Sequence, residues 1–335
     1  MESPFPPTTS AAGGGSIVAR LLPEGGSGLE AITYQYPLKL ISPSGSAEEK
    51  SALVFLLSYG GGLVGGDTIN LSVDVRRGAR LSLVTQGHTK IFKAADPGIV
   101  TRQTLDVHIA EGAGLCLLPD PVQPFEGSNY QQTQIFRLAP QSSLCLLDWV
   151  TQGRTARGEN WSLSKWTGRN EVWVSPKVAD GGREAAAPDR LLVRDTVILD
   201  GDQRHIQIKT LRDTMHNLSV FGTLILRGPL TKSLGDFFLS EFALLPRLGA
   251  RDFRSAEARA NEEEKRTPLE KWRAERQKNE MESRTLWSAA NVRGCIAVKF
   301  GATTVEAGRV WIGSMIAKEG SLAEQFGSQA LMCIR

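Results

Sequence analysis

The stretch with the clearest chemical signature is a run of glycines, YGGGLVGGD, at positions 59–67. Gly60, Gly62 and Gly65 match the G-x-G-x-x-G pattern with which a backbone approaches a dinucleotide pyrophosphate. That chemistry needs a loop that opens a helix, because free N–H groups at the helix N-terminus hold the phosphate. Here the following residues, 67–75, alternate in polarity like a β-strand, and no acidic residue follows at the distance that holds a ribose. The pattern therefore predicts a tight loop between strands and not a nucleotide site.

Charged residues near predicted loops are the next candidates. Asp67 stands where a Walker loop needs lysine, so it excludes that loop and either ends a plain turn or is presented to a partner from a rigid base. Asp120 lies between two prolines, which is typical of a fixed turn. Arg154, Arg157 and Glu159 share a loop beside several tryptophans. Arginine and tryptophan are frequent interface anchors, and tryptophans of the core or a sheet edge are the alternative.

No catalytic or metal-binding array can be read from the sequence. It has no G-x-S-x-G elbow and no His-Glu-x-x-His, and its four histidines lack metal-ligand spacing. The four cysteines are far apart, without Cys-x-x-Cys, so we expect them to be reduced and buried. The longest apolar run, 52–57, is too short to span a membrane, and a net charge of +3 does not favour nucleic acid. We therefore expect a cytoplasmic protein without a tight metal site.

The elements that position these residues are predicted to be mainly β-strands. Segments 53–58, 69–75, 80–86 and 104–110 are rich in β-branched residues or alternate in polarity, with Gly, Pro and Asp between them. Helical patterns are missing between them until past residue 230. This excludes a βαβ layout and favours an antiparallel or coiled all-β body.

Three segments, 73–87, 105–121 and 135–153, share one pattern: a strand, a tight polar turn and a Leu-x-Leu strand. The aligned leucine pairs are Leu81 and Leu83, Leu115 and Leu117, and Leu144 and Leu146. Repeats of this length indicate units that bury a shared face by stacking. We favour stacked, β-helix-like layers, and a chance echo among hairpins is the alternative.

The chain is predicted to form a disordered tail, 1–16, and a single domain, 17–335. Within that domain we expect a β body, 17–250, a charged helical insertion, 251–284, and a strand followed by helices, 285–335. The insertion holds ten basic and nine acidic residues, so we expect it to be solvated and removable from the core.

Capping patterns mark three helix starts. They are Thr267 with Glu270, Thr303 with Glu306, and Ser321 with Glu324, and Gly320 is placed to end the second helix.

Four motifs in a fixed order carry a resemblance to a known family. They are GGGLVGGD (60–67), TQGHTKIF (85–92), PDPVQPF (119–125, with 128–131 behind it) and LDWVTQGRTARGE (147–159). Together they resemble the urease accessory protein D family, called H in some organisms, and the end of the chain resembles its fungal members. The motif-loop residues marked by this resemblance are Gly61, Gly62, Gly65, Gly66, Thr85, Lys90, Arg154 and Arg157.

The resemblance implies a scaffold that is not an enzyme. Such a protein binds apo-urease and accessory protein F, which recruits the GTPase accessory protein G, so GTP belongs to the partner. Nickel would pass through an internal tunnel to urease, without a tightly bound cofactor. Oxygen ligands suit Ni²⁺ in transit, which makes Asp67, Asp120, Asp148 and Glu159 the candidate path or partner-facing residues, whereas His88 is not expected to be a ligand. The alternative is a purely structural adaptor of the same complex.

Two further expectations follow. The protein should need accessory protein F to stay soluble, because its exposed faces should require a partner. Asp67→Ala should lower the nickel content of urease and leave complex formation near normal, unless Asp67 only satisfies backbone donors of its loop.

Overall fold

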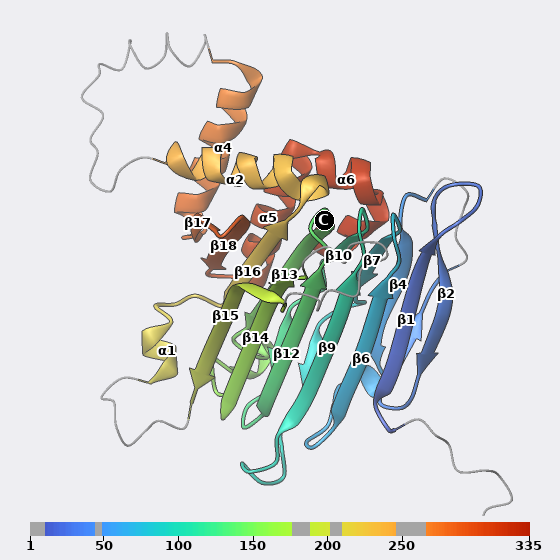
Figure 1. The fold of residues 1–335 in the computed structure, drawn as a ribbon. Coiled ribbons are helices and arrows are strands. Elements are labelled where there is room, and N and C mark those ends of the chain that lie inside the picture. Colours follow the sequence, from blue (N-terminus) through green and yellow to red (C-terminus); the bar gives the residue numbers. More distant parts are fainter. Residues whose placement is uncertain (1–10, 44–48, 176–187, 202–209, 246–265) are drawn as a thin grey trace, which may run out of the picture.

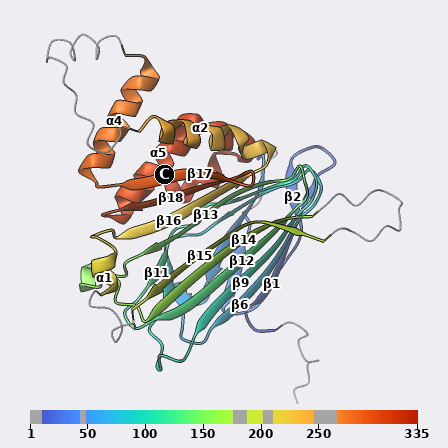
Figure 2. The same ribbon diagram turned by 60° about the vertical axis from the view of Figure 1, so that its left-hand side comes forward.

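Two β-sheets stack face to face, and a layer of helices covers the outer face of one of them (Figures 1 and 2). The computed structural model describes residues 11–43, 49–175, 188–201, 210–245 and 266–335. Strands dominate over helices in this part of the chain, so the predicted mainly β class is confirmed.

Sheet A has seven strands and sheet B has eleven. The order in sheet A is β15 (Arg190–Asp200), β14 (Lys165–Val174), β12 (Asn129–Leu138), β9 (Thr101–Ile109), β6 (Thr68–Val75), β1 (Gly14–Leu21), β2 (Ser27–Tyr34). The main order in sheet B is β17 (Leu286–Val292), β18 (Cys295–Ala302), β16 (Val220–Arg227), β13 (Ser143–Thr151), β10 (Gly114–Leu117), β7 (Arg80–Val84), β4 (Ala52–Ser58), β3 (Leu38–Ile41). Three short strands complete sheet B: β5 (Gly62–Leu63), β8 (Thr89–Ile91) and β11 (Val122–Pro124).

The centres of both sheets are parallel, so of the two predicted arrangements, antiparallel or coiled, the coiled one is present and the antiparallel one is not. Parallel pairing joins successive members of the series β1, β6, β9, β12 and β14 in sheet A. It also joins successive members of the series β4, β7, β10 and β13 in sheet B. Antiparallel pairs occur toward the sheet edges, such as β1 with β2 and β17 with β18. Parallel neighbours need a crossover between them, and here the crossovers run through strands of the opposite sheet instead of through helices. The chain alternates between the sheets from β6 to β14 and so winds like a β-helix, as the repeat predicted.

The repeated leucines lie directly beside one another in sheet B. Leu115 pairs in register with Leu81 on one side and with Leu144 on the other. Leu117 pairs in the same way with Leu83 and Leu146. All six side chains are buried in the core between the sheets, so the sequence echo reflects one stacked unit repeated along the winding.

A second core lies between sheet B and the helices. Outward side chains of β13, β16 and β18 pack against α2 (Lys232–Ala243), α5 (Val305–Glu319) and α6 (Ser321–Phe326). β13 is buried on both faces because it lies between this core and the inter-sheet core. The four cysteines are free and buried, as expected.

The charged insertion is not the solvated helix that its composition predicts. Residues 246–265 lie outside the described ranges, but α4 (Pro268–Glu282) is docked. It begins at Thr267, whose side chain forms the predicted capping box with Glu270. Arg276 and Glu280 are buried, and Trp272 packs against the second core. Few apolar residues suffice to dock α4, because ion pairs and one tryptophan make its contacts with the rest of the protein. A count of hydrophobic residues overlooks such contacts.

Two other helix starts are shifted from the predicted positions. α5 is capped by Thr304 and not by Thr303, because the Thr303 hydroxyl donates to the Ser283 carbonyl at 2.8 Å. α6 begins after Gly320 without a side-chain cap, and the Ser321 hydroxyl donates to Glu319 instead. The predicted end of α5 at Gly320 is confirmed by its left-handed backbone.

The N-terminal strand begins earlier than expected. β1 includes 14–16 of the tail predicted to be disordered, and it pairs with both β6 and β2. Small residues allow this close packing, since a Cβ on Gly15 would lie 2.4 Å from the Leu38 side chain. Residues 1–10 are outside the described part of the chain.

Candidate functional site

The glycine run forms the predicted tight loop between strands. Gly60, Gly61 and Gly66 have φ values of +70°, +73° and +92°, which favour glycine. Gly62 has no room for a side chain, because a Cβ there would lie 2.6 Å from the Phe92 ring. β6 follows the loop at Thr68, so no helix is available to hold a pyrophosphate.

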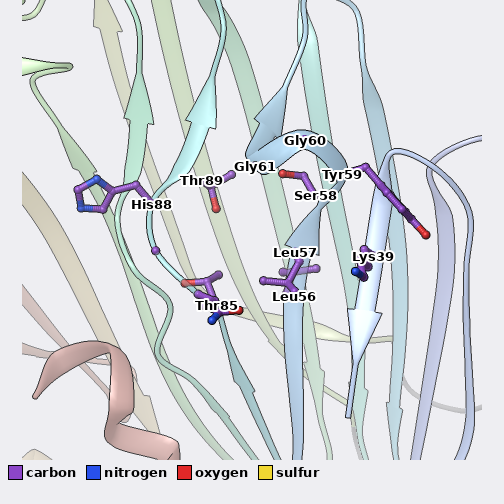
Figure 3. A pocket seen from close by; sticks show the side chains of 12 residues that line it. Lys39, Leu56, Leu57, Ser58, Tyr59, Gly60, Gly61, Thr85, His88 and Thr89 are labelled. Atoms are coloured by element: carbon purple, nitrogen blue, oxygen red, sulfur yellow. The ribbon is translucent and has the colours of Figure 1, made fainter. Parts of the chain in front are cut away.

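This loop and the TQGHT segment border a surface pocket of about 270 Å³, here called the loop pocket (Figure 3). The pocket is lined by Lys39, Leu56, Leu57, Ser58, Tyr59, Gly60, Gly61, Thr85, Gln86, Gly87, His88 and Thr89. In Figure 3 the His88 ring points away from the other labelled side chains. Burial lowers the pKa of His88, and Arg309 and Lys90 lower it further, while Asp120 acts in the opposite direction.

A smaller cavity of about 30 Å³ lies between the two sheets. It shares Leu56, Thr85 and Thr89 with the loop pocket. Its size corresponds to about one water molecule. Asp120 and Asp148 both line it, so the structure brings two of the four candidate acids to one place. The shared residues place the inter-sheet cavity directly behind the loop pocket.

Amides from sheet A and Asp148 from sheet B form a polar belt across the inter-sheet core. The belt consists of Gln103, Gln132, Gln134, Asn170 and Asp148. Gln132 and Asn170 donate to the two Asp148 oxygens at 2.9 and 2.7 Å, and Gln134 donates to the Asn170 carbonyl at 2.9 Å. Burial raises the pKa of the Asp148 carboxyl, although the two amide donors act in the opposite direction.

An ion pair between the sheets lies next to Asp148. Thr223 is the register partner of Asp148 on β16 and donates to Asp195 of sheet A at 3.1 Å. Lys299 of β18 donates to the same carboxylate at 2.7 Å. The polar belt therefore continues from the cavity toward the β15–β18 side of the molecule.

Asp120 is held by three donors from two segments, the TQGHTKIF motif and α5. The Thr85 hydroxyl donates at 3.1 Å, the Gly87 N–H at 2.8 Å and Arg309 Nη2 at 2.9 Å. Arg309 comes from α5, lies 5.6 Å from the Trp149 ring centre and also donates to the Cys333 carbonyl. One arginine of the helix layer thus contacts two of the family motifs and the C-terminal segment.

Glu159 is buried but lines neither cavity. It accepts from the Arg154 N–H at 2.7 Å and from Arg154 Nε at 2.8 Å. Burial acts to raise the pKa of Glu159, but the hydrogen bonds and charge of Arg154 outweigh it and lower that pKa. The guanidinium of Arg154 also lies 3.8 Å from the ring centre of Phe125, which joins two motifs.

The remaining predicted site residues lie elsewhere. Asp67 is half-buried and accepts from the Val64 N–H at 2.9 Å, so it closes its own loop and lines neither cavity. Lys90 and Arg157 are exposed. Gly65 has no room for a side chain, because a Cβ there would lie 2.9 Å from the Ala94 Cα.

Sequence reasoning missed Gln132, Gln134, Asn170 and Arg309. The first two had a readable signal, because alternation along β12 places them on the same face as buried Tyr130 and Phe136. Arg309 had no readable signal in the sequence, because it is 189 positions away from its partner Asp120.

Within the described ranges no group of three or more His, Cys, Asp or Glu is arranged to hold a metal ion. In the same part of the chain, no helix has both the length and the apolar character needed to cross a bilayer. The charged and amide groups of the belt and of the motif loops bind one another. The fold and site define a structural class of protein: two coiled, stacked β-sheets with a polar interior and a helix layer.

Comparison with known proteins identifies the family. The family model described as "UreD urease accessory protein" matches residues 14–334. A "Uncharacterized urease accessory protein ureD-like" of Schizosaccharomyces pombe is 34% identical over 277 residues, covering 82% of this chain and 83% of the relative. "Urease accessory protein D" of Oryza sativa subsp. indica is 32% identical, covering 70% and 72%. "Urease accessory protein UreD" of Sorangium cellulosum is 34% identical, covering 68% and 66%.

The chain belongs to the UreD family of urease accessory proteins. The family assigns it an accessory role in urease maturation.

Proposed function

We propose that this protein is a cytoplasmic scaffold that binds apo-urease and accessory proteins F and G and passes Ni²⁺ toward the urease active site. GTP is bound by accessory protein G and not by this chain. The observation that carries the transit step is the polar belt, whose cavity lies directly behind the loop pocket built from the family motifs.

The belt suits a cation in transit better than a cation in storage. Amide and carboxylate oxygens are weak, exchangeable ligands for a borderline ion, and two acids line the cavity. The raised pKa of Asp148 couples binding of a cation there to release of a proton. The cavity of about 30 Å³ is too small for a hydrated ion, so transit needs the belt to open in the assembled complex.

A purely structural adaptor is the second candidate. It is favoured by the hydrogen bonds that already occupy Asp120, Asp148 and Glu159. In that case the belt would hold the two sheets in register without conducting metal.

One experiment separates the two. The protein is co-expressed with urease and accessory proteins F and G, and complex yield and nickel per urease active site are measured together. Asp148→Asn keeps the shape of the side chain, so transit predicts a normal yield with less nickel. Asp67→Asn is the comparison, since Asp67 lines neither cavity and should cause a smaller loss. A full nickel content of urease with the Asp148→Asn variant would contradict transit and support the purely structural adaptor. Activation of urease in cells that lack this protein would contradict the scaffold role itself.

A further inference from the structure

A groove of about 450 Å³ lies between α4 and α5, on the helix layer and away from the motif loops. It is lined by Trp272, Glu275, Arg276, Asn279, Glu280, Glu282, Ser283, Thr285, Thr304, Glu306, Ala307, Val310, Trp311 and Ser314. None of these residues belongs to a strand. Its volume corresponds to a pocket for a few side chains.

The groove has an apolar floor that the protein itself leaves partly uncovered. Trp311 is 5% exposed and forms the base, together with the half-buried Trp272 and Ala307. Val310, on the surface of α5, is 55% exposed. An apolar surface rimmed by polar residues is typical of an interaction site.

The rim of the groove is acidic. Glu275, Glu282 and Glu306 line it and are exposed. The salt bridges found in the described ranges include none for Glu275 or Glu306, and Glu282 has only an exposed contact with Lys278 at 3.9 Å. The one cation in the lining, Arg276, is buried, and Glu241 and Glu280 match its charge. Lys318 lies 5.6 Å from the Trp272 ring centre, outside the lining residues, so the groove keeps an excess of negative charge.

The walls of the groove are fixed before any partner binds. Arg273 of α4 donates to Glu241 of α2 at 2.9 and 2.7 Å, and Arg276 donates to the same carboxylate at 3.1 Å. Trp311 Nε1 of α5 donates to Glu280 of α4 at 2.8 Å. A preformed groove reduces the ordering cost of association.

We propose that this groove is a docking site for an amphipathic helix of another protein, with an apolar stripe flanked by lysine or arginine. Two helices form the walls and no strand residue lines the groove, so helix packing is the mode of recognition that fits. The acidic rim selects a basic partner by charge complementarity. This inference does not depend on the nickel route.

The test uses three synthetic 18-residue peptides and fluorescence anisotropy with the full chain. The first has a leucine stripe flanked by lysines, the second has the same stripe flanked by glutamates, and the third has the composition of the first in an order without a stripe. The lysine peptide should bind at least about tenfold more tightly than the other two, a difference of about 1.4 kcal/mol. The doubly substituted variant Glu275→Lys/Glu306→Lys should prefer the glutamate peptide instead.

Matched variants keep the proposal falsifiable. Glu24→Lys/Glu30→Lys makes the same charge change at two exposed positions outside the helix layer and should bind the lysine peptide like the wild type. Val310→Ser should weaken binding several-fold without unfolding the chain, as checked by circular dichroism. Absence of saturable binding, or binding that is unchanged by the Glu275 and Glu306 substitutions, would overturn the proposal. Self-association abolished by those substitutions would assign the groove to a second copy and would also overturn it.

Discussion

The buried carboxylates of this protein differ in how their charge is compensated. Asp148 has only neutral amide donors, whereas Glu159 is paired with a guanidinium. Asp120 combines a hydroxyl, a backbone N–H and the Arg309 guanidinium. These differences at single residues determine how each site should respond to mutation and to pH.

Removing Arg309 should destabilise the protein. Arg309→Ala deletes a charged donor to the buried Asp120 carboxylate and a donor to the Cys333 carbonyl. We expect the free energy of unfolding, measured in urea, to fall by roughly 1.5–3 kcal/mol. Arg77→Ala is the control, because Arg77 is exposed, and should change it by less than about 0.5 kcal/mol. Equal effects of the two substitutions would show that Arg309 does not hold the motif loops.

The two acids with shifted pKa values should give opposite pH dependences. The pKa of Glu159 is lowered, so its contribution to stability is present above its ordinary pKa of about 4.3 and is lost as pH falls. The pKa of Asp148 is raised, so its contribution is present below its ordinary pKa of about 3.9 and is lost as pH rises.

Urea unfolding from pH 3.5 to 7 checks this prediction. Relative to the wild type, Glu159→Gln should lose stability as pH rises through the acidic end of this range. Asp148→Asn should gain stability relative to the wild type as pH rises. Parallel curves for the two variants would contradict the assigned environments.

At the scale of elements, α4 shows that a highly charged helix can be an integral part of a core. Its mean composition predicts a solvated helix, but Arg273 and Arg276 bind Glu241 of α2, and Glu280 binds Trp311 of α5. Burying such ions is costly unless every partner is present. The helix is therefore held by ion pairs and hydrogen bonds more than by apolar area, although the buried Nε of Arg276 has no hydrogen-bond partner.

Breaking that network should be costly, contrary to the expectation that the insertion can be removed. Arg276→Ala leaves the buried Glu280 without its cation and Glu241 with Arg273 alone, and we expect a loss of roughly 3–5 kcal/mol in the free energy of unfolding. Lys278→Ala on the same helix is the control, because Lys278 is exposed, and should cost under about 0.5 kcal/mol. A loss that small for Arg276→Ala would mean that α4 is dispensable after all.

At the scale of the whole molecule, the winding places the Leu-x-Leu repeat strands near the centre of sheet B and unlike strands at the edges. β10 and β13 have neighbours on both sides, and β13 is buried along its full length. β2 and β17 are terminal strands of their sheets and are largely exposed. Stability should therefore be distributed unevenly across the fold.

Hydrogen exchange followed by mass spectrometry measures this distribution. Peptides that contain β10 and β13 should exchange far more slowly than peptides that contain β2 or β17, because central amides need opening of two neighbours before they meet water. Backbone amides in α5 serve as an internal reference, since α5 packs on the second core. Uniform exchange across both sheets would contradict a central, cooperative β-helix-like unit.

The sequence by itself determined the mainly β class, the winding repeat, the tight glycine loop and the family motifs. Each of these rests on local patterns: alternation, glycine at positions with positive φ, and a Leu-x-Leu strand that recurs after each tight turn. The register of Leu81, Leu115 and Leu144 followed directly from aligning these repeats. The start of α4 at Thr267 followed from its capping residues.

Only the tertiary structure decided strand direction, the docking of α4 and the membership of the polar site. A strand alternates in the same way whether its neighbours run parallel or antiparallel, so direction depends on the path between sheets. Asp120 and Asp148 line one cavity, whereas Asp67 and Glu159 do not. The positions of these four side chains depend on how the loops close and how the two sheets pack. Arg309 and the amides of Gln132 and Asn170 completed the site from distant segments, and such contacts are set by packing in three dimensions and not by spacing along the chain.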